Sequence, residues 1–332
     1  MKFNKRAYHL IRLLGGLKFA KFISRKHPKI IMYHRVSENG GVDSVSADSF
    51  RKQICIIKNH FNPLTFSQLM KASQEGKVPN NAVVVTIDDG YKDFSEYAWP
   101  ILMQEDVAAT LFITTGFVNR ELWLWPDKIK YVLNHSNKRS LYVPFYGELE
   151  ISENKDEVWH QLANFCLTLE NEKKNTLIDW LFDELGVNKP TFPPKFYEAL
   201  SWDQIRVMVS QGLDIGSHSH SHPILTKLDD TELDFEINKS KQLIFDNLGF
   251  EANSFCYPNG TKSDFNSYIK HCIVRGGYDY AIVAYPDLLP LKDPLEINRY
   301  PGTQSLSLFE KNVYGLSYIW SDFSRRVIKC IK

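Results

Sequence analysis

Two polar motifs in this sequence follow apolar runs and contain residue types that bind metal ions and transfer protons. The first is Asp88-Asp89-Gly90, which comes directly after the apolar run 83–85. Two adjacent carboxylates at the end of a buried strand repel each other unless a cation or a proton intervenes. The alternative interpretation is a polar turn with an aspartate cap, because Asp-Asp-Gly is also ordinary turn chemistry.

The second motif contains three of the ten histidines of the chain, His218, His220 and His222, directly after the apolar run 213–215. It differs from the helical His-Glu-x-x-His pattern of metalloproteases, because Ser219 stands where the glutamate would be. Two imidazoles together with one carboxylate of the first motif are the three protein ligands of a catalytic zinc site, with a position left for water. The two motifs together therefore predict a divalent-metal site.

A third motif, Tyr257-Pro258-Asn259-Gly260, also follows an apolar run. Pro-Asn-Gly forms a tight turn that can leave a backbone N–H facing inward, as a donor to an oxyanion must. A plain turn is the alternative interpretation. A further histidine, His34, follows the run 30–32 and is expected at the end of a strand, close to the other motifs.

In this order, the motifs resemble the polysaccharide deacetylase family, a branch of the carbohydrate esterases, over roughly residues 30–120 and 200–302. The resemblance implies a distorted (β/α)7 barrel and a Zn²⁺ or similar ion that polarises an acetamide and binds the attacking water. It also assigns tasks to six residues. These are Asp88 as general base, Asp89, His218 and His222 as metal ligands, Ser219 as a brace of the histidine loop, and the Asn259 N–H as oxyanion donor.

The chain departs from the family pattern at two positions. Cys256 stands where many members have an arginine that orients the base, and Arg299, near the end of a late strand, is the expected replacement. Many members also take a general acid from a histidine near the C-terminus, whereas this chain has no histidine after His271. His34 is the expected substitute, as in relatives that begin with Tyr-His-Arg-Val. The alternative for His34 is a buried, hydrogen-bonded histidine.

The expected activity is removal of N-acetyl groups from a 2-acetamido sugar in a surface polysaccharide, an oligosaccharide or a lipid-linked glycan precursor. Two alternatives stay open. One is a glycan-binding barrel without catalytic activity, and the other is an amidohydrolase for a non-sugar amide, since the motifs position water and metal without identifying the acyl carrier.

The elements expected around these motifs alternate between short apolar runs and helical stretches, which is typical of a parallel sheet with helices outside it. Two capping boxes, Thr65 with Gln68 and Ser201 with Gln204, mark helix starts. Residues 121–200 differ, with a polar hairpin and a charged helical run, and are expected to be a mainly helical insertion. The expected strands lie at 30–33, 82–87, 109–114, 213–217, 253–257, 280–284 and 295–300.

Composition and charge restrict the possible partners and the location of the protein. The net charge of +1 over 332 residues gives no sign of nucleic-acid binding. The five cysteines are widely spaced, which fits reduced thiols and a cytoplasmic protein. Residues 1–30 contain nine basic residues and no acidic one, interleaved with apolar residues, and lack the apolar stretch of a signal peptide or a spanning helix.

The expected organisation has three parts. Residues 1–28 form a basic amphipathic segment, residues 29–302 form the barrel, and residues 303–332 form a basic amphipathic helix. The alternative for each terminus is a helix that packs on the barrel with its basic face in water. The other interpretation is peripheral contact of these basic segments with the inner face of the cytoplasmic membrane.

Overall fold

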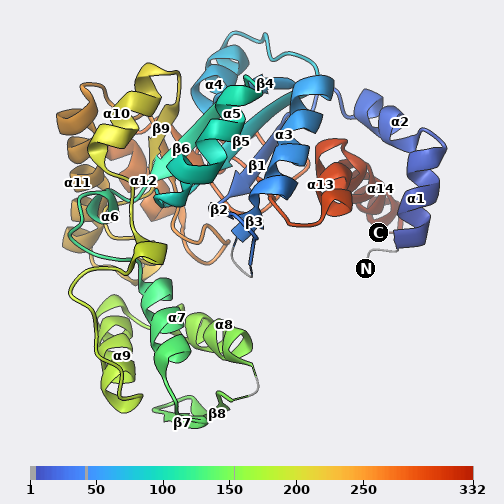
Figure 1. Cartoon of the computed structure of the whole chain (residues 1–332). Coiled ribbons are helices and arrows are strands. Elements are labelled where there is room, and N and C mark those ends of the chain that lie inside the picture. The colour runs from blue at the N-terminus through green and yellow to red at the C-terminus, as the bar shows by residue number, and fades with distance from the viewer. Residues whose placement is uncertain (1–4, 42–43, 153, 332) are drawn as a thin grey trace.

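A computed structural model of the chain describes residues 5–41, 44–152 and 154–331, and its main feature is a parallel sheet (Figure 1). Neighbouring strands follow the order β11-β10-β9-β6-β5-β1-β12, and β4 pairs with the start of β5. The strands of this sheet are β1 (Lys29–Tyr33), β4 (Asn62–Leu64), β5 (Ala82–Ile87), β6 (Ala109–Ile113), β9 (Asp214–Ser217), β10 (Ser254–Cys256), β11 (Tyr280–Ile282) and β12 (Tyr300–Pro301).

The sheet curls into a ring with seven strand positions. Ile297 forms a parallel bridge with Ile282 of β11, and three residues later β12 pairs with β1. The segment from Ile297 to β12 therefore connects the two edges of the sheet. This architecture confirms the predicted distorted (β/α)7 barrel with an insertion. The strand predicted at 295–300 is shorter than expected, because the N–H groups of Asn298 and Arg299 bond to the loop carbonyls of Pro290 and Tyr285 instead of a neighbouring strand.

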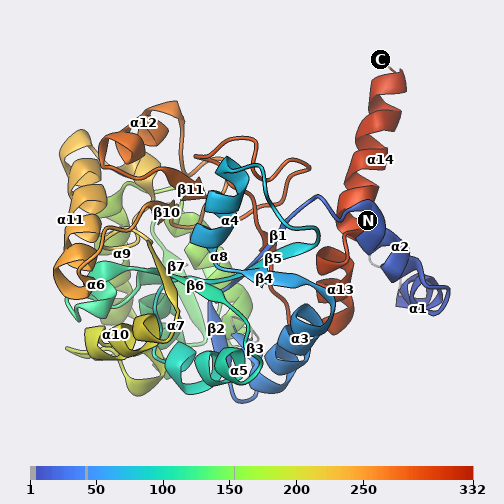
Figure 2. The same ribbon diagram turned by 90° about the horizontal axis from the view of Figure 1, so that it is seen from above.

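Helices surround the ring, as Figure 2 shows from above. Both predicted capping boxes are present, at the starts of α4 and α10, and Asp229 caps α11 in the same way. The helices are α3 (Ala47–His60), α4 (Phe66–Gln74), α5 (Trp99–Gln104), α6 (Thr115–Val118), α10 (Trp202–Ser210), α11 (Asp230–Leu248), α12 (Ser267–Arg275) and α13 (Leu306–Val313). Shorter elements are a π-helix at Phe94–Ala98, 3₁₀ turns at Lys195–Tyr197 and Leu225–Lys227, and the strand pair β2 (Arg35–Ser37) and β3 (Ser44–Ser46).

The elements at residues 125–184, between β6 and β9 in the chain, form a separate layer below the barrel in Figure 1. The layer has its own cluster of buried apolar side chains, which includes Trp123, Trp125 and Phe182. Its elements are α7 (Trp125–His135), β7 (Ser140–Val143), β8 (Gly147–Glu150), α8 (Lys155–Cys166) and α9 (Asn171–Glu184). Trp123 and Trp125 are therefore core residues of this layer.

The helices at the two ends of the chain lie on the same side of the barrel (Figures 1 and 2). They form α1 (Lys5–Leu13), α2 (Gly16–Ile23) and α14 (Leu316–Ile331). After residue 303 the chain forms two helices instead of one, because Gly315 adopts a left-handed φ of 84° between α13 and α14. A side chain at Gly315 would collide with Ser24, so the break also lets α2 approach. Residues 1–4 and 332 of the predicted terminal segments lie outside the described residues.

Candidate active site

The polar motifs meet at one end of the barrel because parallel strands place their carboxyl ends at the same edge of the sheet. Tyr33 of β1 is in register with Ile87 of β5, so His34 and Asp88 follow neighbouring strand ends. Ser217 of β9 is in register with Phe255 of β10, which brings the histidine motif beside the third motif. All the site residues predicted from the sequence lie in this region or line the pocket that opens from it.

One oxygen of Asp89 faces two imidazole nitrogens. The Asp89 Oδ1 atom lies 3.5 Å from His218 Nε2 and 3.6 Å from His222 Nε2. Ligand atoms held about 2.0–2.1 Å from a tetrahedral zinc ion lie roughly 3.3–3.4 Å from each other, so the observed spacing is close to that of a metal site. The Asp89 Oδ1 atom is also buried with no hydrogen-bond partner among the described residues. These residues fit a divalent cation.

The histidine loop presents its ring nitrogens in the form that metals bind. His218 Nδ1 lies 2.8 Å from the Cys256 carbonyl oxygen, so the proton belongs on Nδ1 and Nε2 stays free. Burial lowers the pKa of His218 to about 4, and burial together with the neighbouring His218 lowers the pKa of His222 well below its usual value. Both rings are therefore neutral at physiological pH.

The carboxyl group of Asp89 needs positive charge nearby. Burial and the adjacent Asp88 raise its pKa well above the ordinary value. A cation bound between Asp89 and the two histidines would favour the carboxylate form and satisfy the orphaned oxygen.

Strained backbone conformations collect in these loops. Asp89, Ser219, His222 and Asn259 all have φ between 55° and 76°, in the left-handed region that non-glycine residues rarely adopt. Such strain costs on the order of 1–3 kcal/mol per residue and persists where surrounding contacts enforce it. Here the Ser219 hydroxyl accepts a hydrogen bond from the His222 N–H at 3.0 Å, as predicted for the brace.

Glu236 on α11 is a second support of the histidine loop that sequence reasoning missed. Its buried carboxylate accepts bonds from the N–H groups of His220 and Ser221, both at 2.8 Å, and from the Ser221 hydroxyl. The His220 ring is buried and contacts Thr115 Oγ1 at 3.1 Å and Glu121 Oε2 at 3.1 Å. His220 therefore supports the loop instead of being solvated.

Asp88 faces a different partner from Asp89. Its Oδ1 atom accepts a hydrogen bond from Arg299 Nη1 at 2.7 Å, and both side chains are 1% exposed. Burial raises the pKa of Asp88, but Arg299 and other nearby charges outweigh burial and lower it to about 2. Arg299 is held in turn by the Val283 carbonyl at 3.0 Å and the Thr86 hydroxyl at 3.2 Å.

Cys256 lies between Arg299 and Asp88, with Sγ 3.1 Å from Arg299 Nη2 and 3.6 Å from Asp88 Oδ2. Asp88, His218 and Cys256 form a second group of side chains close enough to share an ion. The guanidinium of Arg299 contacts both Asp88 and Cys256, so a cation there would meet a positive charge. The geometry therefore favours the group with Asp89 as the metal site.

His34 lies on the open side of Asp88. Its Nε2 atom is 3.9 Å from Asp88 Oδ2, and its side chain is 46% exposed. The alternative of a buried histidine is therefore wrong for this position. His34 instead faces the same space as the metal site.

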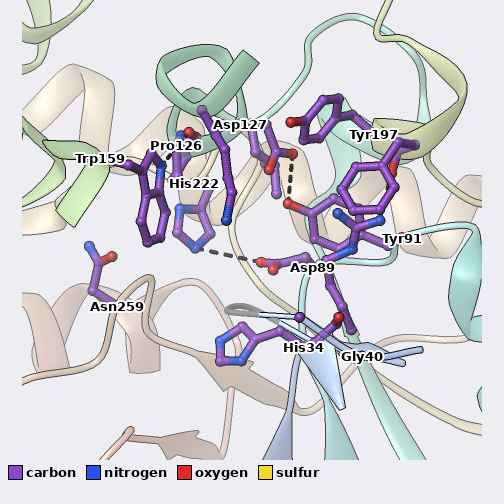
Figure 3. Close-up of a pocket in the computed structure, with 16 residues that line it drawn as sticks. His34, Gly40, Asp89, Tyr91, Pro126, Asp127, Trp159, Tyr197, His222 and Asn259 are labelled. Atoms are coloured by element: carbon purple, nitrogen blue, oxygen red, sulfur yellow. Dashed lines mark hydrogen bonds and ion pairs between the residues drawn. The ribbon is translucent and has the colours of Figure 1, made fainter. Parts of the chain in front are cut away.

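A cavity of about 380 Å³ opens above the metal site, between the barrel and the inserted layer (Figure 3). The barrel contributes His34, Asp89, His222 and Asn259 to its walls. The buried side-chain Nδ2 of Asn259 has no hydrogen-bond partner among the described residues.

The inserted layer forms the opposite wall of the cavity. Trp159 of α8 reaches it, and Figure 3 shows its ring beside His222, toward Asn259. The Trp159 Nε1 atom donates to the Pro126 carbonyl at 2.9 Å, which fixes the ring. Tyr91 also lines the cavity and donates to Asp127 Oδ2 at 2.7 Å. Sequence reasoning missed Trp159, because its position in the sequence is that of an ordinary helix residue.

A model of the polysaccharide deacetylase family matches residues 75–281, more than half of the chain. The chain belongs to the polysaccharide deacetylase family, which confirms the resemblance found in the motifs.

Individual relatives match over shorter or more distant alignments. A poly-beta-1,6-N-acetyl-D-glucosamine N-deacetylase of Staphylococcus aureus is 37% identical over 79 residues, which is 24% of this chain and 27% of that protein. The alignment thus spans about a quarter of the relative's length. Two solved structures share the fold. The deacetylase PplD of Streptococcus pyogenes is 17% identical, with a TM-score of 0.56, and the alignment covers 87% of this chain and 96% of PplD. IcaB of Ammonifex degensii is 16% identical, with a TM-score of 0.55, and the alignment covers 86% of this chain and 97% of IcaB.

Proposed function

We propose that the protein is a metal-dependent deacetylase that removes N-acetyl groups from a 2-acetamido sugar. One observation carries this proposal: the two neighbouring aspartates have different partners. Asp89 faces two neutral imidazoles, and Asp88 is paired with the guanidinium of Arg299. This separation provides a metal ligand and an ionised base side by side, as hydrolysis of an amide by an activated water requires.

Asp89, His218 and His222 would hold the ion, and zinc is the ion expected for two imidazoles and one carboxylate. When bound, the ion supplies a Lewis acid for the acetamide carbonyl and lowers the pKa of water. Asp88 takes the proton of the attacking water, and Arg299 keeps the Asp88 carboxylate oriented and ionised. Donors of Asn259 stabilise the developing oxyanion.

His34 is proposed as the acid that protonates the departing amine. An amine is a poor leaving group unless it receives a proton, so some side chain in the pocket must deliver one. His34 lines the pocket, and its 3.9 Å distance from Asp88 Oδ2 places an acid beside the base.

An N-acetylated glycan is the proposed substrate, and a surface polysaccharide, an oligosaccharide or a lipid-linked precursor are the forms considered. The wall formed by Trp159 supports a sugar, since an aromatic face packs against the C–H face of a pyranose ring. The staphylococcal relative is named as an N-deacetylase of poly-beta-1,6-N-acetyl-D-glucosamine, which supports the same class of substrate. Location in the cytoplasm remains part of the proposal, supported by the wide spacing of the cysteines.

The test is release of acetate from N-acetylglucosamine oligomers and from lipid-linked N-acetylated sugars, with and without a chelator. His218→Ala should lose both metal and acetate release, whereas His160→Ala, a change at an exposed histidine of α8, should keep both. Binding of the oligomers without acetate release by the zinc-loaded protein would favour a glycan-binding barrel. Release of acetate from simple amides alone would favour an amidohydrolase for a non-sugar substrate.

A further inference from the structure

We propose that α1, α2 and the start of α14 dock the protein onto a membrane leaflet that contains anionic lipid. The surface concerned, called the terminal surface below, consists of the exposed apolar side chains of these three helices. They are Leu10, Ile11, Leu13, Leu14, Phe19, Phe22, Ile23, Trp320 and Phe323. This proposal rests on the ends of the chain and is independent of the deacetylase proposal.

The exposure of these side chains is the first observation. Leu13 is 84% exposed, Leu14 is 78% exposed and Phe19 is 65% exposed, although all three are large and apolar. Isolated exposed apolar residues are common, but nine of them on three contacting helices and the connection between the first two are typical of an interaction site. Trp320 and Phe323 lie three residues apart on α14, so they share one face of that helix.

Contacts on the buried side of α2 determine which of its residues face the solvent. Leu17 and Ala20 are buried against the body of the protein. At the end of α2, the buried Lys29 Nζ donates to the carbonyl oxygen of Ser24 at 2.7 Å and to its hydroxyl at 3.0 Å. Because Leu17 and Ala20 point inward, Phe19, Phe22 and Ile23 are left on the solvent side.

Contacts of α1 and α14 hold the other two helices in the same group. Tyr8 of α1 is buried and donates to Glu310 of α13, which also pairs with Arg12 at 3.5 Å. His27, which follows α2, stacks on Tyr318 of α14 with ring centroids 4.3 Å apart. Figures 1 and 2 agree that the three helices lie at the same edge of the molecule.

Charge identifies the occupant as an anionic surface. Residues 1–30 have nine basic residues and no acidic one, and Lys18 and Lys26 are exposed beside the apolar side chains. Two copies of such a surface would repel each other, whereas a leaflet with anionic headgroups takes both the apolar and the basic groups.

The mode of contact is a helix group lying on the leaflet. Among the described residues, no helix is long and apolar enough to cross a membrane. Apolar side chains of interfacial helices enter the boundary between headgroups and acyl chains, and lysines remain at headgroup level. Trp320, which is 55% exposed, is the fluorophore of the terminal surface.

The experiment is flotation of the full-length protein with vesicles of phosphatidylcholine alone and of phosphatidylcholine mixed with phosphatidylglycerol. The wild type should bind the mixed vesicles much more strongly, and added salt should weaken binding. Phe19→Ser/Phe22→Ser should lower partitioning about tenfold for each side chain. Lys18→Ala/Lys26→Ala should lower it about fivefold for each lysine. Brominated lipids should quench tryptophan fluorescence in the wild type and lose most of that effect in Trp320→Phe.

A matched control removes apolar side chains that are exposed elsewhere. Val207 on α10 and Phe245 on α11 are about half exposed, so Val207→Ser/Phe245→Ser should float like the wild type. Equal binding to both vesicle types, or equal loss in the control and in Phe19→Ser/Phe22→Ser, would overturn the proposal. A stable oligomer in lipid-free solution that Phe19→Ser/Phe22→Ser dissolves would also overturn it, because the terminal surface would then join copies of the chain.

Discussion

Replacing Arg299 by methionine tests whether this residue positions the base. Arg299 and Asp88 are both 1% exposed and joined by a 2.7 Å contact, so the change leaves a buried carboxylate without its main partner. Removing one member of a buried ion pair costs about 3–5 kcal/mol of stability. The hydrogen bond to a charged group is itself worth roughly 1.5–3 kcal/mol. If the transition state loses the stabilisation from this hydrogen bond, kcat falls by about 10- to 100-fold.

A double-mutant cycle separates positioning from general damage. Asp88→Asn and Arg299→Met each break the same pair, so the double variant should lose about 1–3 kcal/mol less stability than the sum of the two single changes. Because Asp88→Asn already lacks the base, adding Arg299→Met should change its residual rate little. Arg299→Lys keeps the charge but not the several contacts of the guanidinium, and should fall between wild type and Arg299→Met.

The measurements are acetate release, metal content by elemental analysis and urea unfolding. Arg299→Met should retain metal, because Arg299 contacts Asp88 and Cys256 instead of the ligands Asp89, His218 and His222. Wild-type turnover in Arg299→Met would refute the positioning role. Additive losses of stability in the cycle would equally show that the two side chains do not act as a pair.

Four further changes test other parts of the site and the fold. Asp88→Asn should keep the metal and lose acetate release, whereas Asp89→Asn should lose both, and equal metal loss by elemental analysis would contradict this division of roles. His34→Ala should keep metal but lower kcat by about 10²–10⁴-fold and weaken the alkaline limb of the pH–rate profile, so an unchanged profile would remove His34 from the mechanism. Trp159→Ala should raise KM for sugar oligomers several-fold more than it changes kcat, and an effect on kcat alone would argue against a substrate wall. Burial lowers the pKa of Lys29 from 10.5 to about 7, so between these pH values the unfolded chain binds a proton that the folded chain does not. The free energy of unfolding should therefore rise with pH across this window, by up to about 5 kcal/mol relative to Lys29→Met, and the same pH dependence of urea unfolding in both proteins would contradict it.

The barrel was predictable because its strands are buried on both faces. All residues of β5 and β6 are buried, and both strands stand out in the sequence as short, almost uniformly apolar runs. The last strand could not be bounded in the same way. Its apolar residues predicted a strand at 295–300, but the N–H groups of Asn298 and Arg299 bond to loop carbonyls. The local sequence pattern does not indicate these bonds.

The site was predictable where neighbouring residues share one loop, and less so where it depends on distant contacts. The histidine motif and the aspartate pair are visible as short motifs. Glu236 and Trp159 lie on helices, at spacings that suit ordinary surface or core residues, and their contacts with the site depend on how α11 and α8 pack. Glu236 shares the buried face of α11 with Leu233, Ile237 and Leu243, so an acidic residue at a core position of this helix was the sequence signal that could have identified it.

Arg299 shows how topology replaces a missing motif residue. In the family pattern, an arginine beside the third motif would lie next to Asp88, and in this chain Cys256 occupies that position. Arg299 reaches the same carboxylate because the segment from Ile297 to β12 inserts between β11 and β1, close to the end of β5. The Cys256 thiol is small enough to leave room for the guanidinium and contacts it at 3.1 Å. A larger side chain at Cys256 would compete with Arg299 for the same buried space, so the cysteine at position 256 and the arginine at position 299 are best understood as one compensated change.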